Sequence, residues 1–197
     1  MPDSLPTLPP ALAALLARAS VPPRQLGEPG PDAAALDRAV AAALRAPDHG
    51  GLRPWRFVLI AGPARVALGG LLAASLARRD AATPPERLEL ERAKPLRAPL
   101  VIAAGAVLRH DHKVPLWEQE ATAAAGTMNL LNALDAQGYG AIWLSSAALG
   151  DPEVKRALGF AERDALLGWI YAGTPRGERP RPERADPAPH RRWWSGP

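Results

Sequence analysis

The sequence predicts a fold in which helices cover one central sheet. Helix-like and strand-like segments alternate along the 197 residues, and the strand candidates are apolar on both faces. The hydrophobic content of 47% and the charged content of 22% are ordinary values for a globular domain. A chain of this length is long enough for one substantial core and too short for two complete domains.

The first third of the chain predicts two helices and a strand. Residues 11–18 form a short helix candidate that ends before Pro22, because a proline disfavours the helical conformation in the residue before it. Asp32 can N-cap a second helix that runs to about residue 44. Pro47 cannot continue that helix, and 55–60 is the first strand candidate. The apolar stripe expected on the second helix is Leu36, Val40 and Leu44.

The rest of the chain predicts a regular succession of helices and strands. From Arg176 the composition is rich in Pro and Arg, and no regular structure is expected there. We interpret residues 1–197 as a single domain, with 1–10 and 176–197 as extended arms. The expected elements are a helix over 64–79, a charged helix over 85–94, a strand over 99–107, a long helix over 117–137 capped by Gly138, a strand over 140–145, a short helix over 151–158 and a strand over 166–172.

Composition and charge exclude several classes of protein. There is no cysteine, so a disulfide framework and a thiolate metal site are impossible, and a reducing, cytoplasmic location is expected. The N-terminus has no basic region followed by a long apolar run, so neither a signal peptide nor a membrane span is expected. The net charge of +4 comes from arginines gathered in the 176–197 arm, where Glu178, Glu183 and Asp186 interrupt them. We therefore expect no nucleic-acid partner.

Three clusters of residues carry candidate chemistry. The first, RAPDHGGLRPWRF at 45–57, places four potential donors in a helix-to-strand loop: Arg45, His49, Arg53 and Arg56. Taken singly, Arg45 can pair with the last carbonyls of its helix, His49 can be a solvated turn residue, and Trp55 is core or lid. Their clustering favours a site for an anion or a polar ring.

The second and third clusters have simple structural alternatives. In the second, at 110–120, His110 and His112 suggest a metal only weakly, and Glu118 suits the dipole of the helix that it opens. The third, GYGAIWLSS at 138–146, ends a strand with a Trp and two hydroxyls, a common ligand position, although a core Trp and two edge serines are equally natural. No catalytic triad, carboxylate pair or metal-ligand spacing is present, so the chain itself offers no catalytic residue, and any enzyme reaction would need a cofactor.

Three segments together resemble the nitroreductase superfamily, specifically its small YdjA-type branch. They have the same order and nearly the same spacing as in that branch, and the similarity spans roughly residues 12–175. The segments are RAPDHGGLRPWRF at 45–57, KPLRAPLVIAAGAV through HKVPLWEQ at 94–119, and GYGAIW at 138–143. The resemblance implies a nitroreductase-like α+β sandwich with a mixed central sheet flanked by helices, in an obligate homodimer. It also implies that FMN binds at the dimer interface and takes hydride from NADH or NADPH. The reduced flavin would then reduce a small flat acceptor, nitroaromatic- or quinone-like, by a ping-pong mechanism.

The resemblance also implies which positions meet the cofactors. Arg45 and His49 would contact the flavin bound by the partner subunit. Arg18, Ala19 and Ser20 would hold the phosphate end of FMN. The strand-end segment that meets FMN is Trp143, Leu144 and Ser145. The stretch proposed for the nicotinamide nucleotide consists of Ala133, Leu134, Asp135, Ala136, Gln137 and Gly138.

Two positions depart from the family pattern. Ala19 and Leu144 stand where the family usually has arginine, and each lost charge-assisted hydrogen bond to the FMN phosphate is worth about 1.5–3 kcal/mol. Arg24 can compensate, because it lies in a loop six residues after Arg18. The departures leave a second hypothesis open, in which the fold is kept as a non-redox ligand-binding protein with weakened or lost FMN binding.

Overall fold

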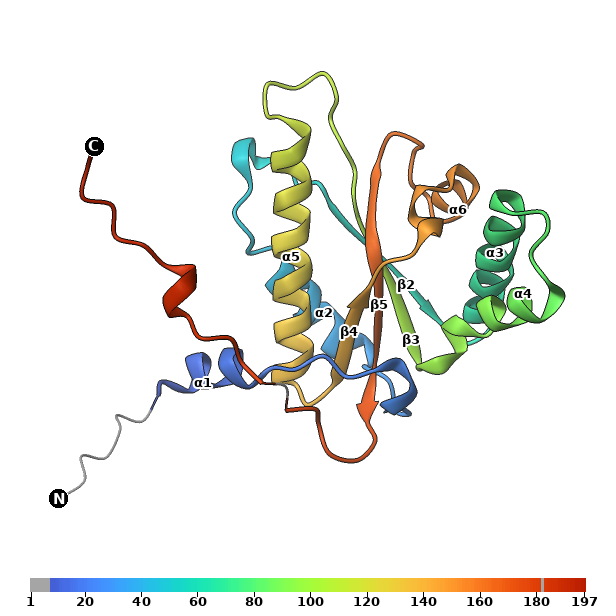
Figure 1. The fold of residues 1–197 in the computed structure, drawn as a ribbon, viewed down its shortest axis with the longest axis horizontal. Coiled ribbons are helices and arrows are strands. Elements are labelled where there is room, and N and C mark those ends of the chain that lie inside the picture. Colours follow the sequence, from blue (N-terminus) through green and yellow to red (C-terminus); the bar gives the residue numbers. More distant parts are fainter. Residues whose placement is uncertain (1–7, 182) are drawn as a thin grey trace.

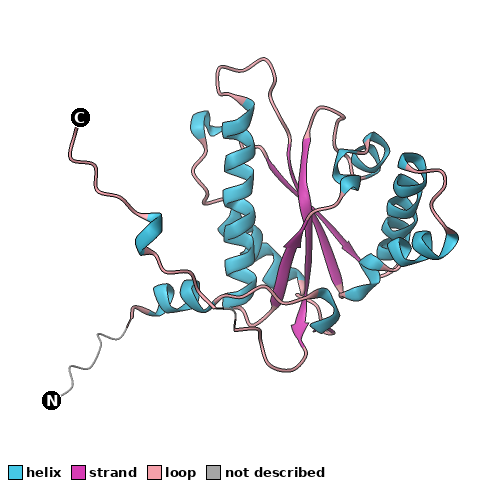
Figure 2. Ribbon diagram, viewed as in Figure 1, coloured by secondary structure: helices cyan, strands magenta, loops and turns pink. Residues whose placement is uncertain are grey.

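A five-stranded antiparallel sheet lies between two layers of helices in the computed structural model, which describes residues 8–181 and 183–197. Figure 2 shows the strands crossing the middle of the molecule with helices on either side. The α+β class that the family resemblance implies is therefore confirmed. This arrangement matters for function because it decides which loops and helix faces come together.

The strands pair only in the antiparallel sense, which corrects the expectation of a mixed sheet. The longest strand, β5, pairs with β3 and β4, and its end pairs with β1, whereas β2 pairs with β3. All four strand pairs are antiparallel, so no parallel pair forms among the described strands. The bounds are β1 Leu26–Gly27, β2 Trp55–Ala61, β3 Leu100–Ala106, β4 Gly140–Leu144 and β5 Ala165–Pro175.

The helices begin and end close to the positions predicted from their caps. The Asp32 carboxylate accepts a hydrogen bond from the Ala35 amide at 2.7 Å, and Gly138 ends the long helix with a positive φ of 90°. The predicted charged helix ends earlier than expected, and Lys94–Arg97 forms a separate 3-10 turn, η3. The helices are α1 Pro10–Ala17, α2 Ala33–Ala43, α3 Ala64–Arg79, α4 Pro85–Arg92, α5 Leu116–Ala136 and α6 Pro152–Ala157.

The sheet separates two hydrophobic cores. Alternate residues of β3 face opposite layers, so that Val101 and Ala103 pack with α3 and α6, while Ile102 and Ala104 pack with α2 and α5. Figure 1 shows α2 and α5 on one face of the sheet and α3, α4 and α6 on the other. Every residue of β3 is buried, as its uniformly apolar sequence predicts.

The buried face of α2 differs from the predicted stripe. Small side chains face the core, and the expected stripe lies beside them, with Leu44 exposed. The reason is close packing of α2 on α5, because a Cβ on Gly126 would lie only 3.0 Å from the Ala43 carbonyl oxygen. Larger side chains would hold the two helices apart. The fully buried residues of α2 are Ala35, Ala39 and Ala43.

Helix α1 and the described tail after β5 lie on the α5 side of the molecule, away from its main body (Figure 1). None of the residues of α1 is buried. Beyond β5 the described part of the tail contains one 3-10 turn, Ala188–His190, and no helix or strand. Most of the predicted 1–10 arm lies outside the described residues, and Pro10 already belongs to α1. Among the described residues, no helix has the length and apolar character required to cross a membrane.

Candidate functional site

Some of the predicted site residues line three separate hollows of the chain. Arg18 and Arg45 line a groove along α5, which we call the α5 groove. Leu144 and Ser145 line a small cavity at the end of β4, the β4 cavity. His49 lines a third hollow at the start of α5, the His49 hollow. A single chain therefore does not bring these residues into one pocket.

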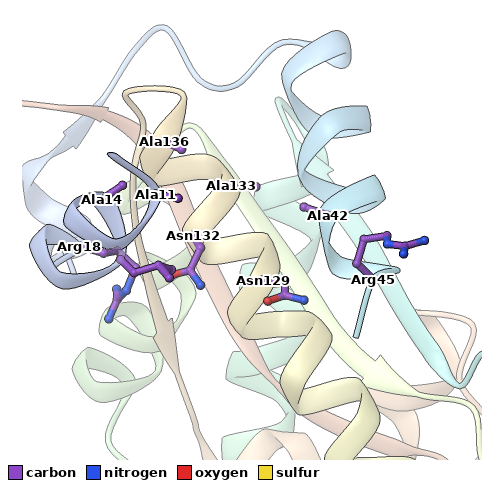
Figure 3. A pocket seen from close by; sticks show the side chains of 10 residues that line it. Ala11, Ala14, Arg18, Ala42, Arg45, Asn129, Asn132, Ala133 and Ala136 are labelled. Carbon is purple, nitrogen blue, oxygen red and sulfur yellow. The ribbon is translucent and has the colours of Figure 1, made fainter. Parts of the chain in front are cut away.

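The α5 groove is an apolar trough of about 450 Å³ with cationic side chains at its two ends. Figure 3 shows Arg18 and Arg45 on opposite sides, with Asn129 and Asn132 of α5 between them. Much of the remaining lining consists of alanines from α1, α2 and α5. Among the described residues, Asn132 Oδ1 is buried without a hydrogen-bond partner. An unpaired buried acceptor is costly, so the groove suits a polar donor from an occupant.

The segment after Arg18 is fixed against the edge of the sheet. The Val21 amide donates to the Ala141 carbonyl of β4 at 3.0 Å, and Arg184 of the tail donates to the Arg18 carbonyl at 2.7 Å. Ala19 is only 6% exposed, whereas Ser20 is exposed. The backbone of the predicted phosphate segment is thus held in place, with its serine hydroxyl accessible.

The β4 cavity has a volume of about 110 Å³ and contains two cations that the sequence did not indicate. Lys94 and Arg97 reach it from η3, and Leu144 is 37% exposed beside them. Lys94 pairs with Glu91 at 2.5 Å, whereas no carboxylate of the described residues lies within 4.0 Å of Arg97. Positive charge is therefore present at the end of β4 even though Leu144 carries none.

Aromatic and hydroxyl groups complete the β4 cavity. The Trp169 indole donates to Ser146 Oγ at 3.0 Å, which fixes both side chains. Burial raises the pKa of Tyr171 to about 12, and the Arg97 charge opposes this shift only in part. The Tyr171 hydroxyl is therefore neutral at physiological pH and can donate a hydrogen bond. Together these groups suit a planar ring with carbonyl oxygens and negative charge.

The His49 hollow joins the first and second sequence clusters. His49 Nδ1 lies 2.6 Å from the Glu118 carboxylate, 69 residues away in sequence, in a hollow of about 350 Å³. The Asp48 carboxylate accepts from the Leu52 and Arg53 amides at 3.1 and 2.8 Å, which closes the loop around His49. Glu118 therefore positions the His49 ring, a role that helix-dipole reasoning alone did not indicate.

Several residues that were predicted to contact a cofactor already form hydrogen bonds or core contacts within the chain. The Trp143 indole donates to the Leu167 carbonyl at 3.2 Å and packs against the core, so its ring is largely structural. In the 133–138 stretch, Leu134 is fully buried and Asp135 pairs with Arg179 at 2.6 Å. Gln137 accepts from Arg38 and donates to the Ala35 and Ala133 carbonyls. Only Ala133 and Ala136 of this stretch line the α5 groove.

The histidines of the second cluster form loop contacts rather than a metal site. His110 Nε2 lies 3.1 Å from the Arg163 carbonyl, and His112 Nδ1 accepts from the Val114 amide at 3.1 Å. Within residues 8–181 and 183–197, no group of three or more potential His, Asp or Glu ligands is close enough to hold a metal.

The sequence matches a known family model and curated relatives over most of its length. The model described as "Nitroreductase family" matches residues 15–174. The Escherichia coli K12 protein named "Putative NAD(P)H nitroreductase YdjA" is 38% identical over 165 residues, covering 84% of this chain and 88% of that protein. A Haemophilus influenzae protein named "Putative NAD(P)H nitroreductase" is 35% identical over 154 residues, covering 77% and 82%.

Solved structures share the fold at lower sequence identity. A nitroreductase-like family protein from Bacillus cereus has a TM-score of 0.82 and 19% identity, covering 98% of this chain and all of that one. A nitroreductase with bound FMN from Bacteroides fragilis has a TM-score of 0.69 and 18% identity, covering 92% and 97%. At these identities the likeness is one of fold.

Proposed function

Because the chain belongs to the nitroreductase family, we propose that it is an FMN-dependent oxidoreductase with NADH or NADPH as co-substrate. FMN would supply the redox chemistry, receiving hydride from the nicotinamide nucleotide and reducing a small flat acceptor, nitroaromatic- or quinone-like, in ping-pong order. The observation that carries the proposal is the β4 cavity, where Arg97 has no carboxylate partner among residues 8–181 and 183–197 and Tyr171 is a neutral donor. This chemistry fits the anionic, carbonyl-bearing ring of a flavin.

The residues proposed to hold FMN divide between its two ends. Arg97, Tyr171 and the Ser145 hydroxyl provide donors for the ring, while Arg18 and Ser20 provide donors for the phosphate. The chain's task is to orient the cofactor and to hold positive charge beside it, since no residue of its own is proposed to react.

A second copy of the chain completes the proposed site. The β4 cavity of one chain is about 110 Å³, smaller than the roughly 300 Å³ of ordinary ligand pockets. On α1, Leu12, Leu15 and Leu16 are 42%, 54% and 56% exposed, an apolar surface that an isolated chain would leave in water. A homodimer would cover these leucines and bring Arg45 and His49 of one subunit toward the β4 cavity of the other.

A non-redox ligand-binding protein is the second candidate, and it is favoured by the two replaced arginines. Ala19 is buried and carries no donor side chain, and Leu144 places an apolar side chain in the β4 cavity. Binding of nucleic acid by the tail is disfavoured, because Arg179 and Arg184 already donate to Asp135, Gly138 and the Arg18 carbonyl.

The deciding experiment is FMN binding by the purified protein. After incubation with excess FMN and desalting, we expect a yellow protein that absorbs at about 450 nm and oxidises NADH or NADPH. Arg45→Gln and His49→Ala should each lower FMN affinity, while Arg163→Gln, a matched change at an exposed arginine, should not. A colourless wild-type protein would refute the redox proposal and favour the second candidate.

A further inference from the structure

A cationic pocket adjoins the β4 cavity, with which it shares Arg97. Arginines from four different segments line a recess of about 400 Å³, which we call the arginine pocket. They are Arg24 of the turn Pro23–Gln25, Arg65 of α3, Arg97 of η3 and Arg176 after β5. The only carboxylate in the lining is Glu28. Arg97 is also proposed above as a donor for the flavin ring, whereas Arg65 and Arg176 have no part in that proposal.

In the described part of the chain, none of the four guanidinium groups forms an ion pair. Among the described residues, no carboxylate lies within 4.0 Å of any of them. The Glu28 carboxylate instead accepts from the Gly30 amide at 3.1 Å. Like charges gathered in one recess repel one another, so this arrangement is unfavourable until an anion enters.

Arg65 occupies a position where a cation is disfavoured. It lies in the first turn of α3, at the positive end of the helix dipole. Its guanidinium donates to the Ala98 carbonyl at 2.5 Å and to the Gly62 carbonyl at 3.4 Å, which orients the side chain across the start of β3. A bound anion would benefit from both the helix dipole and this fixed cation.

Arg176 is held in the arginine pocket by its backbone and by a glycine. Its amide donates to the Gln25 carbonyl at 2.7 Å, which continues the pairing of β1 with the end of β5. Its side chain lies against Gly27, where an added Cβ would collide with Arg176 Nε. Gly27 therefore leaves the room that this guanidinium occupies.

We propose that the arginine pocket binds a small molecule carrying two or more linked phosphate groups, such as the diphosphate of a nucleotide. A guanidinium pairs with phosphate through two parallel hydrogen bonds, so four arginines from separate segments offer enough donors to engage more than one phosphate. The volume of the recess admits more than a single phosphate. A linked diphosphate matches both the charge and the spread of the donors.

The test measures pyrophosphate binding to protein that has been incubated with FMN and desalted, by calorimetry at low ionic strength. Arg24→Gln and Arg176→Gln should each weaken binding by about tenfold or more. Gly27→Ala, which keeps every charge but displaces the Arg176 side chain, should also weaken it. Arg163→Gln, a matched loss of one exposed charge elsewhere, should leave affinity within about twofold.

Three results would overturn the proposal. The first is no binding of pyrophosphate by the wild-type protein at millimolar concentration. The second is equal weakening by Arg163→Gln, which would indicate a general charge effect. The third is sulfate binding as tight as pyrophosphate binding at the same ionic strength, which would exclude selection for linked phosphates.

Discussion

Replacing Leu144 by arginine tests whether the missing charge at the end of β4 limits FMN affinity. Leu144 is 37% exposed and lines the β4 cavity, so an arginine there can reach the cavity with little loss of apolar burial. The other replaced position behaves differently. Ala19 is 6% exposed, and an arginine at that position would bury an unpaired charge and destabilise the fold.

The expected gain follows from one added hydrogen bond. A charge-assisted hydrogen bond contributes about 1.5–3 kcal/mol, and fixing an arginine side chain costs on the order of 1 kcal/mol. The difference, about 0.5–2 kcal/mol, corresponds to a roughly 2- to 30-fold tighter dissociation constant for FMN. Arg97 already places positive charge in the same cavity, so the lower half of this range is expected.

The assay is a fluorescence titration of apoprotein with FMN, repeated at two salt concentrations. Leu90→Arg is the matched control, because it adds the same charge at an exposed leucine of α4. The reasoning is refuted if Leu144→Arg changes the affinity by less than twofold, or if Leu90→Arg increases it equally. A smaller advantage at high salt is expected, since screening weakens exposed charge pairs.

Three further changes test the positioning and packing described above. Glu118→Gln should weaken FMN binding by releasing the His49 ring, with less than about 1 kcal/mol lost from stability, as is usual for exposed pairs. Asp151→Ala removes the side-chain cap of α6 and should lower the unfolding free energy by about 1–2 kcal/mol in urea titrations. Gly69→Ala should destabilise by about 1–3 kcal/mol because its Cβ collides with the backbone of α4, whereas the neighbouring Gly70→Ala should stabilise by up to about 1 kcal/mol.

The contribution of Asp151 also sets a pH dependence. Burial is the largest effect and raises the pKa of its carboxyl, but hydrogen bonds from Arg78 and from the Glu153 and Val154 amides together lower that pKa below its usual value. A lowered folded-state pKa stabilises the protein above the unfolded value of about 4, and this stabilisation is lost as the pH falls through the folded value. The wild-type protein should therefore lose more stability than Asp151→Ala on acidification below about pH 4.

Unchanged FMN affinity in Glu118→Gln would show that the His49 contact is incidental. Equal stability of the two glycine variants would contradict the close approach of α3 and α4. Thermal and urea unfolding of each variant distinguish these outcomes from simple misfolding.

Local signals in the sequence predicted most of the fold. Asp32 and Gly138 mark helix ends through hydrogen bonds and backbone angles within a few residues of themselves, so their roles can be read without tertiary contacts. The strand β1 was missed because two residues carry no periodicity, and its pairing depends on the distant end of β5. The alanine face of α2 was missed because it reflects the approach of α5, not a property of α2 alone.

The site was less predictable, because it depends on which distant segments meet. His49 and Glu118 were each noticed, but only the crossing of the first loop over α5 makes them partners. Lys94 and Arg97 lie about 50 residues before Leu144, in a segment whose sequence reads as the end of a charged helix. Leu134 was assigned to a nucleotide through motif position, yet the helix turns it into the core.

In the proposed homodimer, the short helix α1 would tie cofactor binding to the concentration of the protein. It has eight residues and no buried side chain, and isolated helices of fewer than about 12 residues are only marginally stable in water. In the proposed homodimer the partner subunit would cover its leucines, and association would include the entropy cost of ordering this segment. Arg18 caps the same helix. On dilution we expect helix content, the position of Arg18 and FMN affinity to fall together, which circular dichroism and flavin fluorescence can follow on one sample.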